Sequence, residues 1–187
     1  MCVYKQFTVY AVYIVGWVRG VTQLGNIVYI VCNKSPTIDV YSADTLSPLG
    51  EGVDVEEMIH PKDIVACHSD RQLYVADWNC IWRVSADDHS YVKWLTIEST
   101  TDRFHDYWLS VTSQRLLVTS SQPPSLRQYS TIDRRLLRVV PLPECVEKLY
   151  HAVETTRQTF VVCHQGTSQN SQQYAVSDLF SNACKII

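Results

Sequence analysis

Short apolar runs recur along the chain at a nearly constant spacing. They cover residues 27–31, 73–76, 116–119 and 160–162. Each run has three to five β-branched, aromatic, alanine or leucine residues and follows a turn of small or polar residues, which predicts a strand buried on both faces. The strands that precede them are anchored on Val21, Ile64, Leu109 and Ala152, in steps of 43, 45 and 43 residues. A period of about 40–50 residues with several short strands per unit is typical of a β-propeller blade.

Two weaker strand signals complete each unit. The third strand alternates apolar and polar residues, as in 38–41 and 81–84, which favours one wet face. The fourth and outermost strands are expected at 49–55, 92–97, 136–142 and 185–187. No helical periodicity of comparable strength appears. The pattern therefore predicts an all-β fold, a β-propeller with about four four-stranded blades at 17–62, 63–107, 108–150 and 151–187.

The number of blades leaves two alternatives open. Propellers have about four to eight blades, and a ring of only four strains the packing between sheets. The chain therefore predicts either a four-bladed propeller or part of a six-bladed one. Residues 1–16 form a separate segment, with an apolar run at 9–15 that favours a strand over a signal peptide. This strand either closes the last blade or is the remnant of a preceding blade.

Composition narrows the class of molecule. Apolar residues make up 46% and charged residues 19%, which excludes a disordered chain. A net charge of −3 gives no general attraction to nucleic acid or to an anionic membrane. The one basic cluster, Arg134, Arg135 and Arg138, is expected in a solvated hairpin turn. Seven cysteines without a CxxC pair favour reduced thiols and a cytoplasmic protein over a zinc ribbon or a redox site.

The second unit carries the most recognisable motif. Residues 60–65 begin with His-Pro-Lys, and residues 72–84 contain the string Leu-Tyr-Val-Ala-Asp followed by an Asn-containing turn and an Ile-x-x-Val strand. This resembles the NHL repeat of six-bladed, TolB-like or YVTN-like propellers. The other units keep the apolar skeleton but lose the counterpart of Asp77. The resemblance implies a recognition module that binds protein partners. It also implies RNA binding in some relatives through a basic face, which the acidic balance of this chain disfavours.

Loops at one end of a propeller form its usual binding face. The loops that enter each blade and those that follow each second strand bring aromatic, histidine and charged residues to this end. We expect Trp17, Trp108 and Tyr150 to pack between blades and Trp78 to be the exposed contact. The candidate binding residues are Lys62, Trp78, Asn79, His105, Asp106, His151 and His164.

Metal chemistry is the main competing hypothesis. His60, His105 and His151 occupy nearly equivalent positions, and three histidines could bind zinc or copper if they converged. Calcium-dependent propeller hydrolases of the lactonase type use oxygen ligands instead. The oxygen-bearing candidates are Asn33, Asp77, Asn79, Asp106 and Glu154. They do not share one repeated position, and no Gly-x-Ser-x-Gly nucleophile motif is present.

The sequence thus predicts a non-catalytic protein-interaction or scaffold module that uses the loop face of a propeller and needs no cofactor or metal. A calcium- or zinc-dependent hydrolase is the alternative, and an RNA-binding propeller is a weaker one. The expected partners are proteins rather than a membrane or nucleic acid. Self-association through an open propeller edge is a further expectation.

Overall fold

The prediction of an all-β propeller-type fold is confirmed. The structure is a computed structural model that describes residues 16–97, 107–112, 114–121, 123–140, 142, 146, 148–155, 159–165 and 184–186. The described residues form antiparallel sheets and contain no helix, so none that could cross a membrane. The predicted strand at 9–15 lies outside the described residues.

Four sheets follow one another along the chain. The first contains β1 (Val18–Leu24), β2 (Ile27–Cys32), β3 (Thr37–Ser42) and β4 (Val53–Asp54). The second contains β5 (Asp63–Cys67), β6 (Gln72–Ala76), β7 (Cys80–Ser85) and β8 (Tyr91–Thr96). The third contains β9 (Tyr107–Thr112), β10 (Arg115–Ser121), β11 (Pro124–Ser130) and β12 (Leu136–Val140). The fourth contains β13 (Lys148–Glu154), β14 (Phe160–Gln165) and β15 (Cys184–Ile186).

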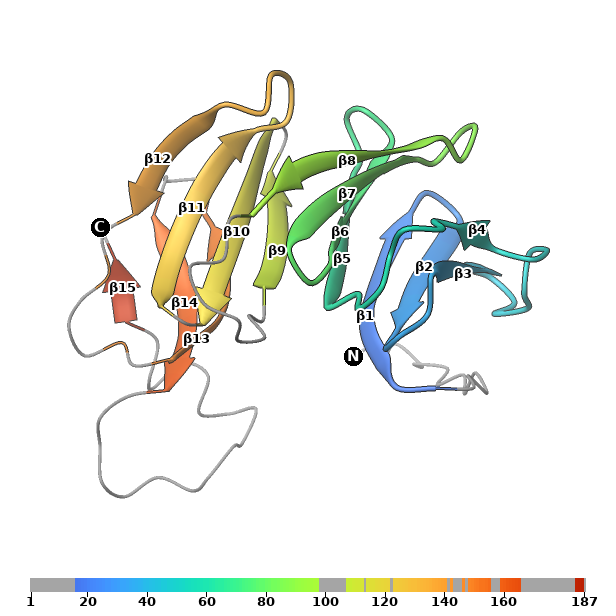
Figure 1. Cartoon of the computed structure of the whole chain (residues 1–187), viewed down its shortest axis with the longest axis horizontal. Coiled ribbons are helices and arrows are strands. Elements are labelled where there is room, and N and C mark those ends of the chain that lie inside the picture. Colours follow the sequence, from blue (N-terminus) through green and yellow to red (C-terminus); the bar gives the residue numbers. More distant parts are fainter. Residues whose placement is uncertain are drawn as a thin grey trace, which may run out of the picture.

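The sheets stand side by side in a curved row. Figure 1 shows the first sheet at one end of this row and the fourth at the other, so the described strands form an open arc. The third sheet begins at Tyr107 and the fourth at Lys148, one and three residues before the expected boundaries of 108 and 151.

The second strand of the second sheet, β6, has a continuous apolar run because both of its faces are buried. In β6, Leu73 and Val75 pack into the cluster shared with the first sheet, while Tyr74 and Ala76 pack into the cluster shared with the third. Successive side chains of a strand point to opposite faces, so one continuous apolar run serves two cores. A third apolar cluster joins the third and fourth sheets in the same way.

The outer strands differ from the sequence prediction in two places. In the predicted strand at 49–55, only Val53 and Asp54 form β4, and β4 pairs with only two residues of β3. The strand predicted at 185–187 as the outermost one is β15, which pairs directly with β14. Its position was misjudged because pairing between segments far apart in the chain leaves no local signal, and the free edge of β14 takes it as a partner.

The innermost strands β1, β5, β9 and β13 meet at close range. The Ala66 N–H donates to Thr22 Oγ1 at 3.1 Å, and the Leu109 N–H donates to Asp63 Oδ2 at 2.8 Å. The Ser110 hydroxyl donates to the Ala152 carbonyl at 2.8 Å. A short polar side chain thus links each inner strand to the backbone of its neighbour.

Gly20 marks the closest approach of β1 and β5. A Cβ at this position would lie 2.7 Å from the Ile64 nitrogen and 3.0 Å from Asp63 Oδ1. The nitrogen belongs to the backbone of β5 and cannot move without shifting the strand. Glycine is therefore required here by the spacing between sheets.

We predict that Gly20→Ala lowers the free energy of unfolding by about 1–3 kcal/mol, because the added methyl group forces the inner strands apart. Urea unfolding followed by tryptophan fluorescence measures the loss. Val21→Ala is the matched control, since Val21 is exposed on the same strand and its truncation leaves the junction intact. Equal losses for the two variants would contradict the close-approach argument.

Candidate functional site

The loop end of the first two sheets carries the clearest candidate binding surface. The sheets are antiparallel, so the segment that enters a sheet and the loop after its second strand lie at the same end. At this end, the segment before β5 meets the Trp78–Asn79 turn between β6 and β7. We call this surface the loop face and define it by Trp17, Ile59, His60, Lys62, Trp78 and Asn79.

The buried carboxylate of Asp77 holds the backbone of the loop face in place. Its carboxylate is only 2% exposed and accepts two backbone hydrogen bonds from the entering segment, from Ile59 at 3.1 Å and from His60 at 2.6 Å. It also accepts the Trp78 N–H at 2.8 Å and the Trp82 indole N–H at 3.2 Å. Four donors fill both oxygens, so the aspartate holds two loops together and its oxygens are not presented as calcium ligands.

Three further contacts fix the loop face. The rings of His60 and Trp78 lie with their centroids 5.3 Å apart. The Lys62 N–H donates to the Ala76 carbonyl at 2.8 Å, and the Ile97 N–H donates to the Asn79 carbonyl at 2.7 Å. The structure therefore places Lys62, Trp78 and Asn79 at the same end of the second sheet.

Trp17 corrects a sequence prediction. It was expected to pack between blades, but it is 77% exposed at the start of β1, where its carbonyl accepts the Asn33 N–H at 2.8 Å. Trp108 and Tyr150 do pack against each other as expected, with ring centroids 5.9 Å apart in an edge-on arrangement. Ile59, which the sequence did not single out, is 61% exposed beside His60. Trp78, expected as the exposed contact, is instead half-buried beside His60. The exposed apolar side chains of the loop face are therefore Trp17 and Ile59.

The remaining candidate residues belong to the fourth sheet or cannot be placed. His151 lies on β13 with Nε2 3.1 Å from the Leu109 carbonyl, and His164 lies on β14. His105 and Asp106 lie outside the described residues. His60 and His151 contact different partners in different sheets, so the described pair does not converge. Within the described residues, no three His, Cys, Asp or Glu side chains are grouped to hold a metal ion.

Cys80 has no nucleophilic character in this environment. The thiol is buried at the start of β7. Burial, reinforced by the nearby Asp77 carboxylate, raises the pKa of Cys80 to about 12. The thiol therefore stays protonated near neutral pH and acts as a small apolar side chain.

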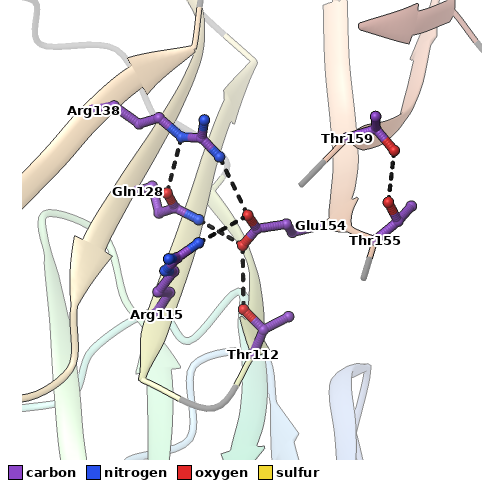
Figure 2. Close-up of polar contacts among 7 residues, drawn as sticks. All are labelled: Thr112, Arg115, Gln128, Arg138, Glu154, Thr155 and Thr159. Carbon is purple, nitrogen blue, oxygen red and sulfur yellow. Dashed lines mark hydrogen bonds and ion pairs between the residues drawn. The ribbon is translucent and has the colours of Figure 1, made fainter. Parts of the chain in front are cut away.

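A second polar cluster joins the third and fourth sheets and is shown in Figure 2. Its centre is Glu154 on β13, whose side chain is 5% exposed. Oε1 lies 3.2 Å from Arg115 Nη1 and 3.2 Å from Arg138 Nη2. Oε2 accepts hydrogen bonds from Gln128 at 2.6 Å and from Thr112 at 3.3 Å. Glu154, a calcium candidate in the sequence, is instead the anionic centre of an inter-sheet ion-pair network.

Arg138 also departs from the sequence prediction. It lies on β12 rather than in a solvated turn, donates from Nε to Gln128 Oε1 at 3.0 Å and stacks 4.8 Å from the Phe160 ring centroid. Arg134 follows the prediction and lies exposed in the β11–β12 turn. No signal local in sequence pairs Arg138 with Glu154, because the contact depends on how two sheets stack.

We predict that Asp77→Ala lowers the free energy of unfolding by about 2–4 kcal/mol, since it leaves four donors without their acceptor. Hydrogen exchange should speed up at the Ile59 and His60 amides before the sheets unfold. Asp87→Ala is the control, because Asp87 forms an exposed ion pair with Arg71 at 2.6 Å. Unchanged exchange at Ile59 and His60 would show that Asp77 does not clamp the loops.

We predict that Glu154→Gln costs about 2 kcal/mol, a value reduced for the partial exposure of both arginines. The variant leaves Arg115 and Arg138 near each other without their shared carboxylate. Thermal unfolding measures the effect. Arg135→Gln is the control, since its pair with Asp133 at 3.7 Å is solvent-exposed and should contribute little. A Glu154→Gln protein as stable as the control would rule out a stabilising role for the network.

Comparison with known proteins supports the fold. No protein-family model and no curated protein sequence matches the chain. Among solved structures, hydrazine synthase of Kuenenia stuttgartiensis is similar with a TM-score of 0.64 and 15% identity, over 84% of this chain and 47% of that one. A chain of the nidogen/laminin complex is similar with a TM-score of 0.62 and 14% identity, over 80% of this chain and 57% of that one.

The Cps50 (Swd1) β-propeller domain of Myceliophteria thermophila gives a TM-score of 0.59 and 10% identity, over 79% of this chain and 49% of that one. The chain thus spans about half the length of these similar structures. Identities this low carry information on fold alone. These structural similarities and the four consecutive antiparallel sheets together show that the chain has a β-propeller-type fold.

Proposed function

We propose that this chain is a non-catalytic protein-interaction module that binds a partner protein through the loop face. The observation that carries the proposal is the exposure of Trp17 and Ile59, whose backbone groups are hydrogen-bonded to Asn33 and to Asp77 respectively. Large exposed apolar side chains on a preorganised surface are good anchors, because little conformational entropy is lost when a partner covers them. The resemblance of the second unit to NHL repeats supports the same use.

Polar groups around these side chains fit the rim of such an interface. Asn79 is exposed, Lys62 is half-buried, and the Arg19 guanidinium lies 3.4 Å from Asn33 Oδ1 beside Trp17. Interfaces commonly surround an apolar centre with polar groups that remain accessible to water. This composition, with charges of both kinds on the chain, favours a protein surface over a polyanion such as RNA.

The experiment is affinity capture with the full chain as bait, followed by mass spectrometry. We expect the double variant Trp17→Ala, Ile59→Ser to lose at least one specific partner that the unmodified chain retains, and Trp78→Ala to weaken the same partner. Val92→Ser is the matched control, since it removes an exposed apolar side chain from β8, away from the loop face. Thermal unfolding confirms that each variant is folded.

The proposal fails if the double variant captures the same partners as the unmodified chain. It also fails if Val92→Ser loses them equally, because the binding would then not depend on the loop face. The affinity of the purified complex should fall only slightly as the salt concentration rises, because the centre of the interface is apolar. The affinity of an RNA complex would fall steeply over the same range.

A further inference from the structure

The outer edge of the third sheet is an unusual surface. β12 pairs with β11 on one side, and no described strand pairs with its other side. An outermost strand directs alternate backbone N–H and C=O groups away from its sheet, where another extended chain can bind them. These groups can be satisfied by water or by an added strand.

Three of the five side chains of β12 are both apolar and exposed. Leu136, Leu137 and Val139 are all accessible, with Val139 55% exposed, and Ile132 in the preceding turn is 70% exposed. An edge strand is normally protected by being short or by carrying lysine. β4 has two residues, and β8 carries Lys93, which is bound to Glu57 at 3.1 Å. β12 has five residues and no lysine, and its one charged side chain, Arg138, is bound to Gln128 and Glu154 of its own and the next sheet.

The edge is also held in a fixed shape. The Ser130 N–H donates to the Arg135 carbonyl at 2.9 Å, and the Arg134 N–H donates to the Ser130 carbonyl at 3.0 Å, so the turn before β12 is closed. Arg138 anchors the middle of the strand to Gln128 and Glu154. A preformed strand loses little entropy when it pairs, which favours binding.

The charge around β12 indicates which kind of chain can pair with this edge. The segment 132–140 carries Arg134, Arg135 and Arg138 against Asp133, and Arg138 is paired with Glu154. Three arginines against two carboxylates leave a net charge of +1, which lies at Arg134 and Arg135 in the turn. A second copy of the chain paired through β12 would bring these like charges together, which is destabilising. An acidic segment would instead gain attraction along the same edge.

We propose that β12 binds an extended segment of a partner protein by β-strand addition, and that this segment alternates apolar and acidic residues. Backbone hydrogen bonds along β12 provide the affinity, and Leu136, Leu137 and Val139 contact the apolar side chains of the added strand. Arg134 and Arg135 select the acidic residues. This surface is separate from the loop face and does not depend on it.

The test uses the full chain and two labelled synthetic peptides, one of alternating valine and glutamate and one of alternating valine and lysine. Fluorescence anisotropy should show binding of the glutamate peptide only. Hydrogen exchange of the complex should show new protection of amides within 136–140. The double variant Arg134→Glu, Arg135→Glu should weaken glutamate-peptide binding about tenfold, from the loss of two rim charge pairs.

Matched variants separate this edge from general stickiness. Val139→Ser should weaken binding of the glutamate peptide. Val92→Ser on β8 and Trp17→Ala on the loop face should leave the affinity for this peptide unchanged. The proposal is overturned if neither peptide binds, if both bind equally, or if binding leaves the 136–140 amides unprotected. Protection of these amides that rises with protein concentration, without peptide, would make a second copy the occupant and would also overturn it.

Discussion

The junction between innermost strands is the constraint on which the arrangement of sheets depends. The inner strands β5, β9 and β13 each turn one backbone edge away from their own sheet. A short side chain from the preceding sheet meets that edge, and these side chains are Thr22, Asp63 and Ser110. Longer side chains would hold the sheets apart, and apolar ones would leave backbone groups without partners. The polar residue and the close spacing therefore require each other, and Gly20 is where the spacing is tightest.

Burial in this junction changes the proton affinity of the Asp63 carboxyl. Burial raises the pKa of its carboxyl above the ordinary value, although the N–H groups of Leu109 and Ile64 oppose the shift. A raised carboxyl pKa means that the folded state binds a proton more readily than the unfolded state, so this group's contribution to stability falls as pH rises from the ordinary value through the raised one. The carboxylate nevertheless serves the junction, because it accepts hydrogen bonds from two strands at once.

Much of the fold could be predicted from sequence because the apolar pattern of each strand is local. The runs containing Leu73 and Leu116 identified strands buried on both faces, and β6 and β10 lie there. The position of β15 and the partners of Glu154 could not be predicted, because both depend on the stacking of segments that are remote in the chain. Trp17 was misjudged for a related reason, since exposure depends on which neighbouring segment covers a side chain.

The same limit applies to the loop face. The string around Asp77 singled out this loop, but it did not reveal that the carboxylate accepts hydrogen bonds from the backbone of two loops. At the corresponding end of the third and fourth sheets, Thr119 Oγ1 and His164 Nδ1 are buried without a hydrogen-bond partner among the described residues. Within the described residues, these two side chains therefore do not tie two loops together as the Asp77 carboxylate does.

The way the apolar clusters are divided has a consequence for synthesis of the chain. The cluster between the first two sheets is complete at Tyr91, and the cluster between the last two requires Val162. Because each core needs only one preceding sheet, the amino-terminal pair can pack while later residues are still on the ribosome. Every later sheet then meets a finished template, and contacts that are remote in the chain form one neighbour at a time.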